Sequence, residues 1–146
     1  MTDQKLRAAV DAHIQSDAFA RFLGAAVTIV APGHSRVSLT VTDDMTNFHG
    51  ITHGGVVFAL GDLAFAAASN SRGQVAVALN VSICFLNPST VGDRLVAEAK
   101  ECHLGGRTGL YEIMVVEETS GRLIARSQDL VYLKKQWFVT TKGPGT

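Results

Sequence analysis

The spacing of apolar residues predicts a chain built mainly of strands, with one long apolar helix near its middle. From His34 to Thr42, apolar side chains occupy every second position, which is typical of a strand with one buried face. Similar patterns predict further strands over residues 25–31, 74–86, 95–104, 110–118 and 122–133. In the longest of these, the alternating residues are Val75, Val77, Leu79, Val81, Ile83 and Phe85.

Two stretches show helical spacing instead. Residues 3–15 carry apolar side chains on one face, which predicts a short amphipathic helix that Phe19, Phe22 and Leu23 hold against the body. Residues 55–70 are apolar on nearly every face, which predicts a buried helix. A flat sheet cannot cover such a helix, so we expect the long antiparallel strands that follow to curl around it. The sequence therefore predicts one α+β domain over residues 1–146, with a curled antiparallel sheet wrapped around one long buried helix and a short helix at the N-terminus.

Composition supports one domain and argues against some classes of binding partner. Of the 146 residues, 47% are hydrophobic and 18% are charged, so the chain can fill a core and bury further apolar surface between subunits. Lys plus Arg and Asp plus Glu both number 13, so we expect neither a nucleic acid nor a membrane as partner. The polar start of the chain and the interrupted apolar run favour neither a signal peptide nor a membrane span. Cys84 and Cys102 fall in predicted strands, where we expect small core thiols in a reducing cytoplasm.

Asp62 is the one charged residue in the apolar helix, and burying an unpaired carboxylate there is costly. A polar loop over residues 47–53 precedes the helix. Gly54 and Gly55 begin it, where free N–H groups and the helix dipole favour a developing negative charge. Together these features indicate a catalytic site. Simpler interpretations stay open, namely a tight turn at the glycines, a capping or core role for His53 and a solvent-facing stripe for Asp62.

The residues of this region follow the order Asn47-x5-His53-Gly54-Gly55-x6-Asp62, with a helix and four strands behind them. In this order and spacing the chain resembles the hot-dog-fold acyl-CoA thioesterases, and most of all their phenylacetate-pathway, or PaaI-type, branch. The resemblance covers about residues 20–133. The segment Leu86-Asn87-Pro88 followed by Gly92-Asp93 is also similar to the one after that family's long strand. The resemblance implies a hot-dog fold and hydrolysis of an acyl-CoA thioester to a free acid and coenzyme A.

The resemblance also implies roles for the matching residues. Asp62 corresponds to the acid that activates water or attacks the thioester directly, and Gly54 to the residue whose backbone N–H polarises the thioester carbonyl. His53 and Asn47 correspond to residues that orient the carbonyl or the leaving thiolate. Asp62 of one subunit is expected to face the loop of another, so that a homodimer forms the site and two dimers form a tetramer.

One position departs from the family. Some relatives carry Ser or Thr on the long strand to hold the attacking water, whereas the aligned residue here is Ala78, with Asn80 and Ser82 nearby. The identity of the residue that orients the water is therefore open, and we expect Ala78 and Asn80 to border the substrate.

The resemblance implies that coenzyme A enters only as part of the substrate, with no other cofactor and no metal ion. His49 and His53 lie four residues apart in a loop without a third ligand, which is a weak zinc motif. The candidate contacts to the coenzyme A phosphates are Arg107 and Thr108 in a Gly-rich turn, with Arg72 and Lys100 as further cations. The acyl group, expected to be phenylacetyl, a hydroxylated aryl or a short to medium chain, would lie across the dimer seam against residues of the helix: Gly55, Phe58, Leu60 or Leu63, and Phe65.

Two other functions stay open. Asp44-x4-His49 is similar in spacing to a hydratase motif of hot-dog enzymes but lacks its Asn-Pro, so an enoyl-CoA hydratase or dehydratase is one alternative. A non-catalytic acyl-CoA-binding module, which would tolerate loss of Asp62, is another. The chain has neither a Gly-x-Ser-x-Gly elbow nor a phosphate-binding loop, which argues against an α/β-hydrolase and a P-loop enzyme.

Overall fold

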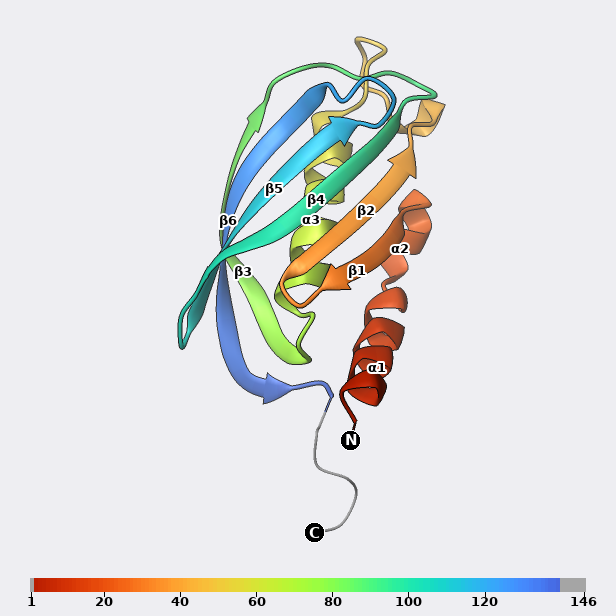
Figure 1. Cartoon of the computed structure of the whole chain (residues 1–146). Helices are drawn as coiled ribbons and strands as arrows, with labels where there is room; N and C mark the ends of the chain where they lie inside the picture. The colour runs from red at the N-terminus through yellow and green to blue at the C-terminus, as the bar shows by residue number, and fades with distance from the viewer. Residues whose placement is uncertain (1, 140–146) are drawn as a thin grey trace.

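In the computed structural model, which describes residues 2–139, six strands form one antiparallel sheet that curls around the helix α3 (Figure 1). The elements in chain order are α1 (Asp3–Gln15), α2 (Ala18–Leu23), β1 (Ala26–Ala31), β2 (His34–Thr40), the 3-10 helix η1 (Asp43–Met45), α3 (Gly54–Ser69), β3 (Gln74–Phe85), β4 (Arg94–Leu104), β5 (Thr108–Glu117) and β6 (Leu123–Trp137). The strands lie in the order β1-β2-β4-β5-β6-β3, so β1 and β3 form the two edges. Within residues 2–139, no helix is both long enough and apolar enough to cross a membrane.

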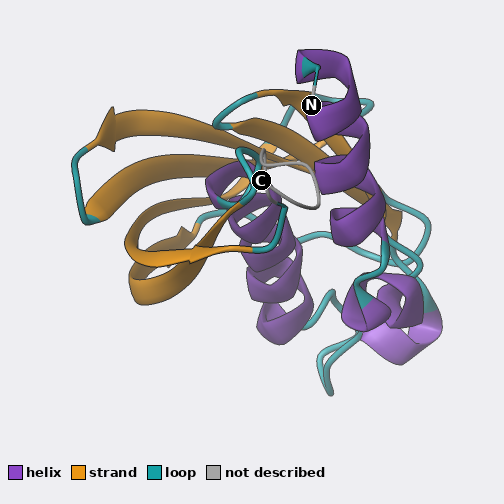
Figure 2. Ribbon diagram, turned by 90° about the horizontal axis from the view of Figure 1, so that it is seen from below, coloured by secondary structure: helices purple, strands orange, loops and turns teal. Residues whose placement is uncertain are grey.

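The helix α3 packs against the inner face of the sheet and forms the core with it. Leu60, Ala64 and Phe65 are buried in this core, and Phe65 meets Tyr111 edge-on with ring centroids 5.6 Å apart. The strands contribute their alternating apolar residues: Val37, Leu39, Leu95, Ala97, Ile113, Val115 and Val131. A curled antiparallel sheet beside one long helix, with the short helix α1 at the N-terminus, confirms the predicted α+β hot-dog architecture (Figures 1 and 2).

The predicted elements begin and end within a few residues of the observed ones, except that β6 continues past Leu133 to Trp137. The short helix α2 escapes a prediction based on periodicity because its six residues are too few to show a period. Its signals are local: the Asp17 side chain accepts the Ala20 N–H at its start, and Gly24 ends it with φ 67°.

Four side chains that the sequence places inside lie at the surface. Phe19 and Phe22 of α2 are exposed, so Leu23 alone of the expected anchors packs against the core. Cys84 and Cys102 are also exposed, and Cys102 is the extra residue of an irregularity in β4. The expectation of core thiols is therefore wrong.

A bulge interrupts the edge strand β3. The pairing of β3 with β6 skips one residue, Leu79, between Ala78 and Asn80. Ala78 therefore lies on the inner face ahead of the bulge, and Val81 lies on the same face after it. The single alternation predicted over residues 75–85 is wrong ahead of the bulge, and the side chain of Leu79 is exposed at the edge of the sheet.

Candidate active site

One stripe along α3 is left uncovered by the sheet of its own subunit. The exposed positions of the helix are Gly55, Phe58, Asp62 and Ala66, which recur at intervals of three or four residues and so share one side. Most of the remaining helix is buried against the strands. Figure 2 shows α3 beside the concave side of the sheet rather than enclosed by it.

Asp62 lies in the middle of this stripe. In the single subunit its side chain is exposed, so the expectation of a buried carboxylate is wrong there and the solvent-facing alternative describes the isolated chain. Neighbouring groups nevertheless remove part of its hydration, which raises the pKa of the Asp62 carboxyl, and the charge of Asp17 raises it further. Within residues 2–139, no side chain or backbone group forms a hydrogen bond or ion pair with Asp62, so its oxygens are free to act on another molecule.

The N-terminus of α3 is capped by His53. Its Nδ1 atom accepts the Gly55 N–H at 2.8 Å, and its carbonyl accepts the Val56 N–H at 2.9 Å. The capping interpretation of His53 is therefore correct, and a neutral His53 must carry its proton on Nε2, which leaves a second donor. The Gly54 N–H is different, because no acceptor for it exists within residues 2–139. The predicted donor for a developing oxyanion is thus open, at the positive end of the helix dipole.

Asn47 organises the loop in front of this helix end. Its Oδ1 atom accepts the His49 N–H at 2.9 Å, and its backbone N–H donates to the Ile51 carbonyl at 2.8 Å. Asn47 and Gly54 then line one cavity of about 440 Å³, together with apolar residues that include Phe85, Leu86, Pro88 and Ile124. The structure therefore brings two of the predicted site residues to one apolar cavity.

The other predicted residues of this region lie around that cavity rather than in it. His53 and Gly55 border a second cavity of about 400 Å³, with Phe19, Phe22 and Asp44 on its walls. The Phe48 ring lies 4.3 Å from the His49 ring, between centroids, and within residues 2–139 the His49 side chain forms no hydrogen bond. The hydratase alternative gains no support, because no contact joins Asp44 to His49 in the described part of the chain.

Gly54 and Asp62 are far apart in one subunit for a direct attack by the carboxylate on a carbonyl that Gly54 binds. They are eight residues apart on the same helix, which corresponds to about 12 Å. A carbonyl oxygen bound to the Gly54 N–H lies about 3 Å from it, and an attacking atom about 3 Å from the carbonyl carbon. An Asp62 carboxylate that attacks directly would therefore not reach a carbonyl bound to the Gly54 N–H of its own helix.

Several residues predicted to contact the substrate do not line the cavity beside Gly54. Leu60 and Phe65 are buried in the core, so their assignment to the acyl pocket is wrong. Leu63 belongs to the same core but also lines a cavity. Phe58 lines the small cavity beside Asp62. Asn80 pairs with Leu130 and lies on the opposite face of β3 from Val81, away from Asp62. Ala78 is on the inner face but lines none of these cavities.

The cations also lie apart from the helix end. The Arg107 carbonyl accepts from Leu133, which pairs with Ala76 near the start of β3. The Gly54 end lies instead beside Phe85, nine residues or about 30 Å further along that strand. Within one subunit, Arg107 and Thr108 are therefore remote from Gly54. Two further cations are engaged: Arg72 pairs with Glu101 at 2.6 Å, and Lys100 with Glu98 at 3.0 Å.

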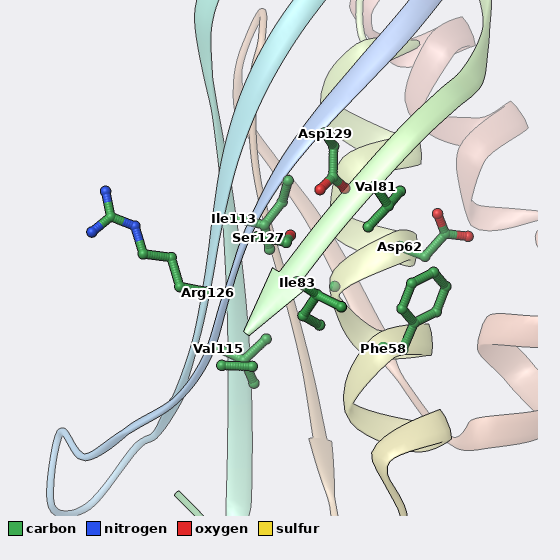
Figure 3. Close-up of a pocket in the computed structure, with 11 residues that line it drawn as sticks. Phe58, Asp62, Val81, Ile83, Ile113, Val115, Arg126, Ser127 and Asp129 are labelled. Atoms are coloured by element: carbon green, nitrogen blue, oxygen red, sulfur yellow. The ribbon is translucent and has the colours of Figure 1, made fainter. Parts of the chain in front are cut away.

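A second acid near Asp62 is missing from the sequence prediction. Asp129 of β6 is 1% exposed and lines a small cavity that Asp62 and Ser127 also line (Figure 3). Burial raises the pKa of Asp129 to about 6, the Ser127 hydroxyl opposes this rise, and the Asp62 charge adds to it. The signal was available in the alternation of β6, because Asp129 shares its face with Ala125, Ser127 and Val131.

Comparison with known proteins gives results that agree with one another. A family model described as the thioesterase superfamily matches residues 49–124. Acyl-coenzyme A thioesterase PaaI of Escherichia coli is 43% identical over 107 residues, which are 73% of this chain and 76% of that protein. A putative esterase of Archaeoglobus fulgidus is 37% identical over 131 residues, which are 90% and 84% of the two chains. The structure of the E. coli PaaI protein, from the phenylacetic acid degradation operon, matches with a TM-score of 0.84 and 35% identity, over 90% of this chain and 98% of that one.

Proposed function

The chain belongs to the thioesterase superfamily and is a hydrolase of thioester bonds, and from this premise we propose that it cleaves acyl-coenzyme A in a site shared by two subunits. The Gly54 N–H of one subunit binds the thioester carbonyl, and Asp62 of the other delivers the attack. The observation that carries the proposal is the separation of an open N–H and an unpaired acid by about 12 Å on one helix. This separation suits two half-sites completed by a second copy.

The edge strand β3 supports the pairing of two copies. It has 12 residues, forms one border of the sheet and carries exposed apolar side chains at Val77, Leu79 and Phe85. A long edge strand with exposed apolar residues is a surface on which another strand can pair. Two copies related by a two-fold axis would pair their β3 strands antiparallel. This arrangement directs the exposed stripe of each α3 toward the N-terminal end of the other.

The same arrangement gives a role to the turn between β4 and β5. In an antiparallel pair, the start of β3 in one subunit lies beside the end of β3 in the other. Arg107 and Thr108 would then approach the Gly54 end of the second subunit, where an arginine and a hydroxyl can bind the phosphates of coenzyme A. The association of two such dimers into a tetramer remains part of the proposal.

The chemistry needs a nucleophile and a place for one negative charge. Attack on the carbonyl carbon moves charge to the oxygen, where the Gly54 N–H stabilises it. Asp62 either takes a proton from the attacking water or attacks directly, after which water cleaves the resulting anhydride. Each route consumes one water, breaks the carbon–sulfur bond and releases a carboxylic acid and the coenzyme A thiol. The raised pKa of Asp62 makes it a stronger base than an ordinary aspartate, and the Asn47 amide and His53 Nε2–H are donors for the carbonyl or the leaving thiolate.

The cavity beside Gly54 supports an apolar acyl group. Its walls include Phe85, Leu86 and Ile124, and its volume of about 440 Å³ is in the range of small-molecule sites. The related E. coli protein comes from the phenylacetic acid degradation operon. We therefore favour phenylacetyl and hydroxylated aryl thioesters, followed by short and medium aliphatic chains.

A thiol-release assay over a panel of acyl-coenzyme A thioesters tests the proposal. The panel contains phenylacetyl, hydroxyphenylacetyl, acetyl and hexanoyl thioesters, and the variants are Asp62→Asn and Asp62→Ala, with Asp43→Ala as a control at a nearby exposed acid. We expect both Asp62 variants to lose at least about a hundredfold in kcat/KM, or about 3 kcal/mol of barrier, while remaining folded. Near-wild-type turnover in Asp62→Ala would refute the role of Asp62. Tight binding without thiol release by the wild type would establish a binding module, and enoyl-coenzyme A hydration lost in Asp44→Ala would establish a hydratase.

A further inference from the structure

Asp129 is a buried acid with one unsatisfied carboxyl oxygen. It is 1% exposed, and its Oδ1 atom has no hydrogen-bond partner within residues 2–139. Its cross-strand neighbours are Val81, which is apolar, and Tyr111, whose hydroxyl donates to Glu101 at 2.9 Å. A buried carboxyl group in such surroundings destabilises the fold unless something binds it. Its presence in the core therefore needs a reason other than packing.

The cavity that Asp129 lines has the size and polarity of a site for one water molecule. Its volume is about 10 Å³, which is close to the smallest space that holds a water. Three of the residues that line it are polar, namely Asp62, Ser127 and Asp129, and the strand β3 contributes only Val81 and Ile83. In Figure 3 the Arg126 side chain extends to the other side of the sheet, where it pairs with Glu112 at 3.0 Å. Figure 3 also shows the side chain of Val81 between the two carboxyl groups.

We propose that Asp129 is a positioning residue for Asp62: together with Ser127 it binds one water molecule in this cavity, and that water holds the Asp62 carboxylate in place. This inference rests on the proposed role of Asp62. It assigns the binding of a water to residues of β6, because β3 carries Ala78 where some relatives carry Ser or Thr. The water has three polar partners, which is the usual number for a buried water.

Asp129 is protonated in this cavity below about pH 6. The charged group that faces Asp129 is Asp62 from α3, and within residues 2–139 no cation faces it from β3, β5 or β6. Asp129 keeps its proton up to about pH 6, because burial and the Asp62 charge both raise its pKa. A protonated carboxyl can donate a hydrogen bond to the water, which can in turn donate to Asp62.

The test compares Asp129→Leu and Asp129→Asn in the full chain, with Glu112→Gln as a matched control on the outer face of β5. We expect Asp129→Leu to lower kcat by about tenfold to a hundredfold, the range found for residues that orient catalytic ligands, with little change in KM and a raised Tm. Below pH 6, where Asp129 is protonated, Asp129→Asn keeps a donor and should recover most of kcat. If Asp129 served only the fold, Asp129→Leu would instead lower the Tm, and kcat would fall in proportion to the folded fraction. That result, or unchanged kcat in Asp129→Leu, would overturn the proposal.

A second measurement separates this inference from the proposed function. The pKa of Asp129 can be followed by carboxyl-carbon NMR in the wild type and in Asp62→Asn. If the two groups share the cavity, removing the Asp62 charge lowers the pKa of Asp129, whatever the enzyme hydrolyses. An unchanged pKa would overturn the link between the residues. Full activity of Asp62→Ala would instead refute the proposed function while leaving this titration intact.

Discussion

The Nδ1 atom of His53 accepts the Gly55 N–H at 2.8 Å, and this bond determines which N–H at the start of α3 stays open. A carbon atom added at Gly55 would lie 3.0 Å from that same Nδ1, so a side chain there would push the imidazole away. The cap thus uses the second N–H of the helix and leaves the first, at Gly54, for a ligand. The arrangement also fixes the imidazole so that its Nε2 atom points away from the helix end.

Replacing His53 separates capping from catalysis. His53→Ala loses the cap, which costs about 1 kcal/mol, and also loses the Nε2 donor, so both stability and kcat should fall. Asn is a good capping residue, so His53→Asn should restore the free energy of unfolding while kcat stays low. Urea unfolding and thiol release on the same samples provide the two readouts. Recovery of kcat together with stability in His53→Asn would show that the histidine acts only as a cap.

Replacing Gly54 by proline removes the proposed oxyanion donor with little disturbance. Proline lacks an N–H and is favoured at the first position of a helix, and His53 already has φ −61° and ψ 135°, which suits a residue before proline. We expect Gly54→Pro to fold and to lose about 100- to 1000-fold in kcat. Gly54→Ala keeps the N–H, and its added carbon would lie 3.6 Å from the Phe85 ring, an ordinary contact, so it is the matched control. Equal losses in both variants would assign the effect to bulk rather than to the N–H.

The alternation of apolar residues predicted most of the sheet because each strand buries one face. It could not reveal the bulge at Leu79, since one extra residue changes the face of every neighbour without changing composition. The apolar pattern of the helix α3 was also misleading about the burial of Asp62. A helix covered by its own sheet and one with a stripe kept for a second chain have the same apolar sequence, so Asp62 and Phe58 were predicted inside although both are exposed here.

The candidate site was predictable only in part, for a related reason. The order of Asn47, Gly54 and Asp62 along the chain identified the helix end and the acid, and Asn47 does line the cavity beside Gly54. Spacing along the chain carries no information on which subunit completes the site. Asp129 comes from a strand far along the chain, and only the folded sheet places it near Asp62.

Mixing two inactive variants tests whether the site is shared between subunits. Asp62→Ala lacks the acid and Gly54→Pro lacks the donor, so each homodimer has no complete site. A heterodimer has one complete site, made from the intact Gly54 of one chain and the intact Asp62 of the other. After unfolding and refolding an equal mixture, random pairing should restore about a quarter of the wild-type activity per dimer. Mixing Asp62→Ala with Asp62→Asn is the control and should restore nothing. No recovery in the first mixture would place acid and donor in the same chain, against the 12 Å estimate.

The stability of Asp129→Asn should depend on pH in a direction that follows from its titration. The pKa of Asp129 is raised from 3.8 to about 6, so the folded state holds a proton that the unfolded state releases over this window. The free energy of unfolding therefore falls as the pH rises from about 4 to about 6, and the full cost of this group is present above pH 6. At about 1.4 kcal/mol per pKa unit, the cost is of the order of 3 kcal/mol. Asp129→Asn removes it, so the variant should exceed the wild type in stability at pH 7.5 and approach it at pH 4.

Urea unfolding at pH 4, 5.5 and 7.5, at one fixed protein concentration, measures this difference. Glu112→Gln is the control, because it also neutralises one carboxyl group, on the outer face of β5, where Glu112 pairs with Arg126. A constant difference between Asp129→Asn and the wild type at all three pH values would mean that Asp129 titrates as an ordinary aspartate. The carboxyl in the core would then be about half ionised at pH 4 and ionised at pH 5.5, and the water that we place beside it would have to be the donor rather than the acceptor.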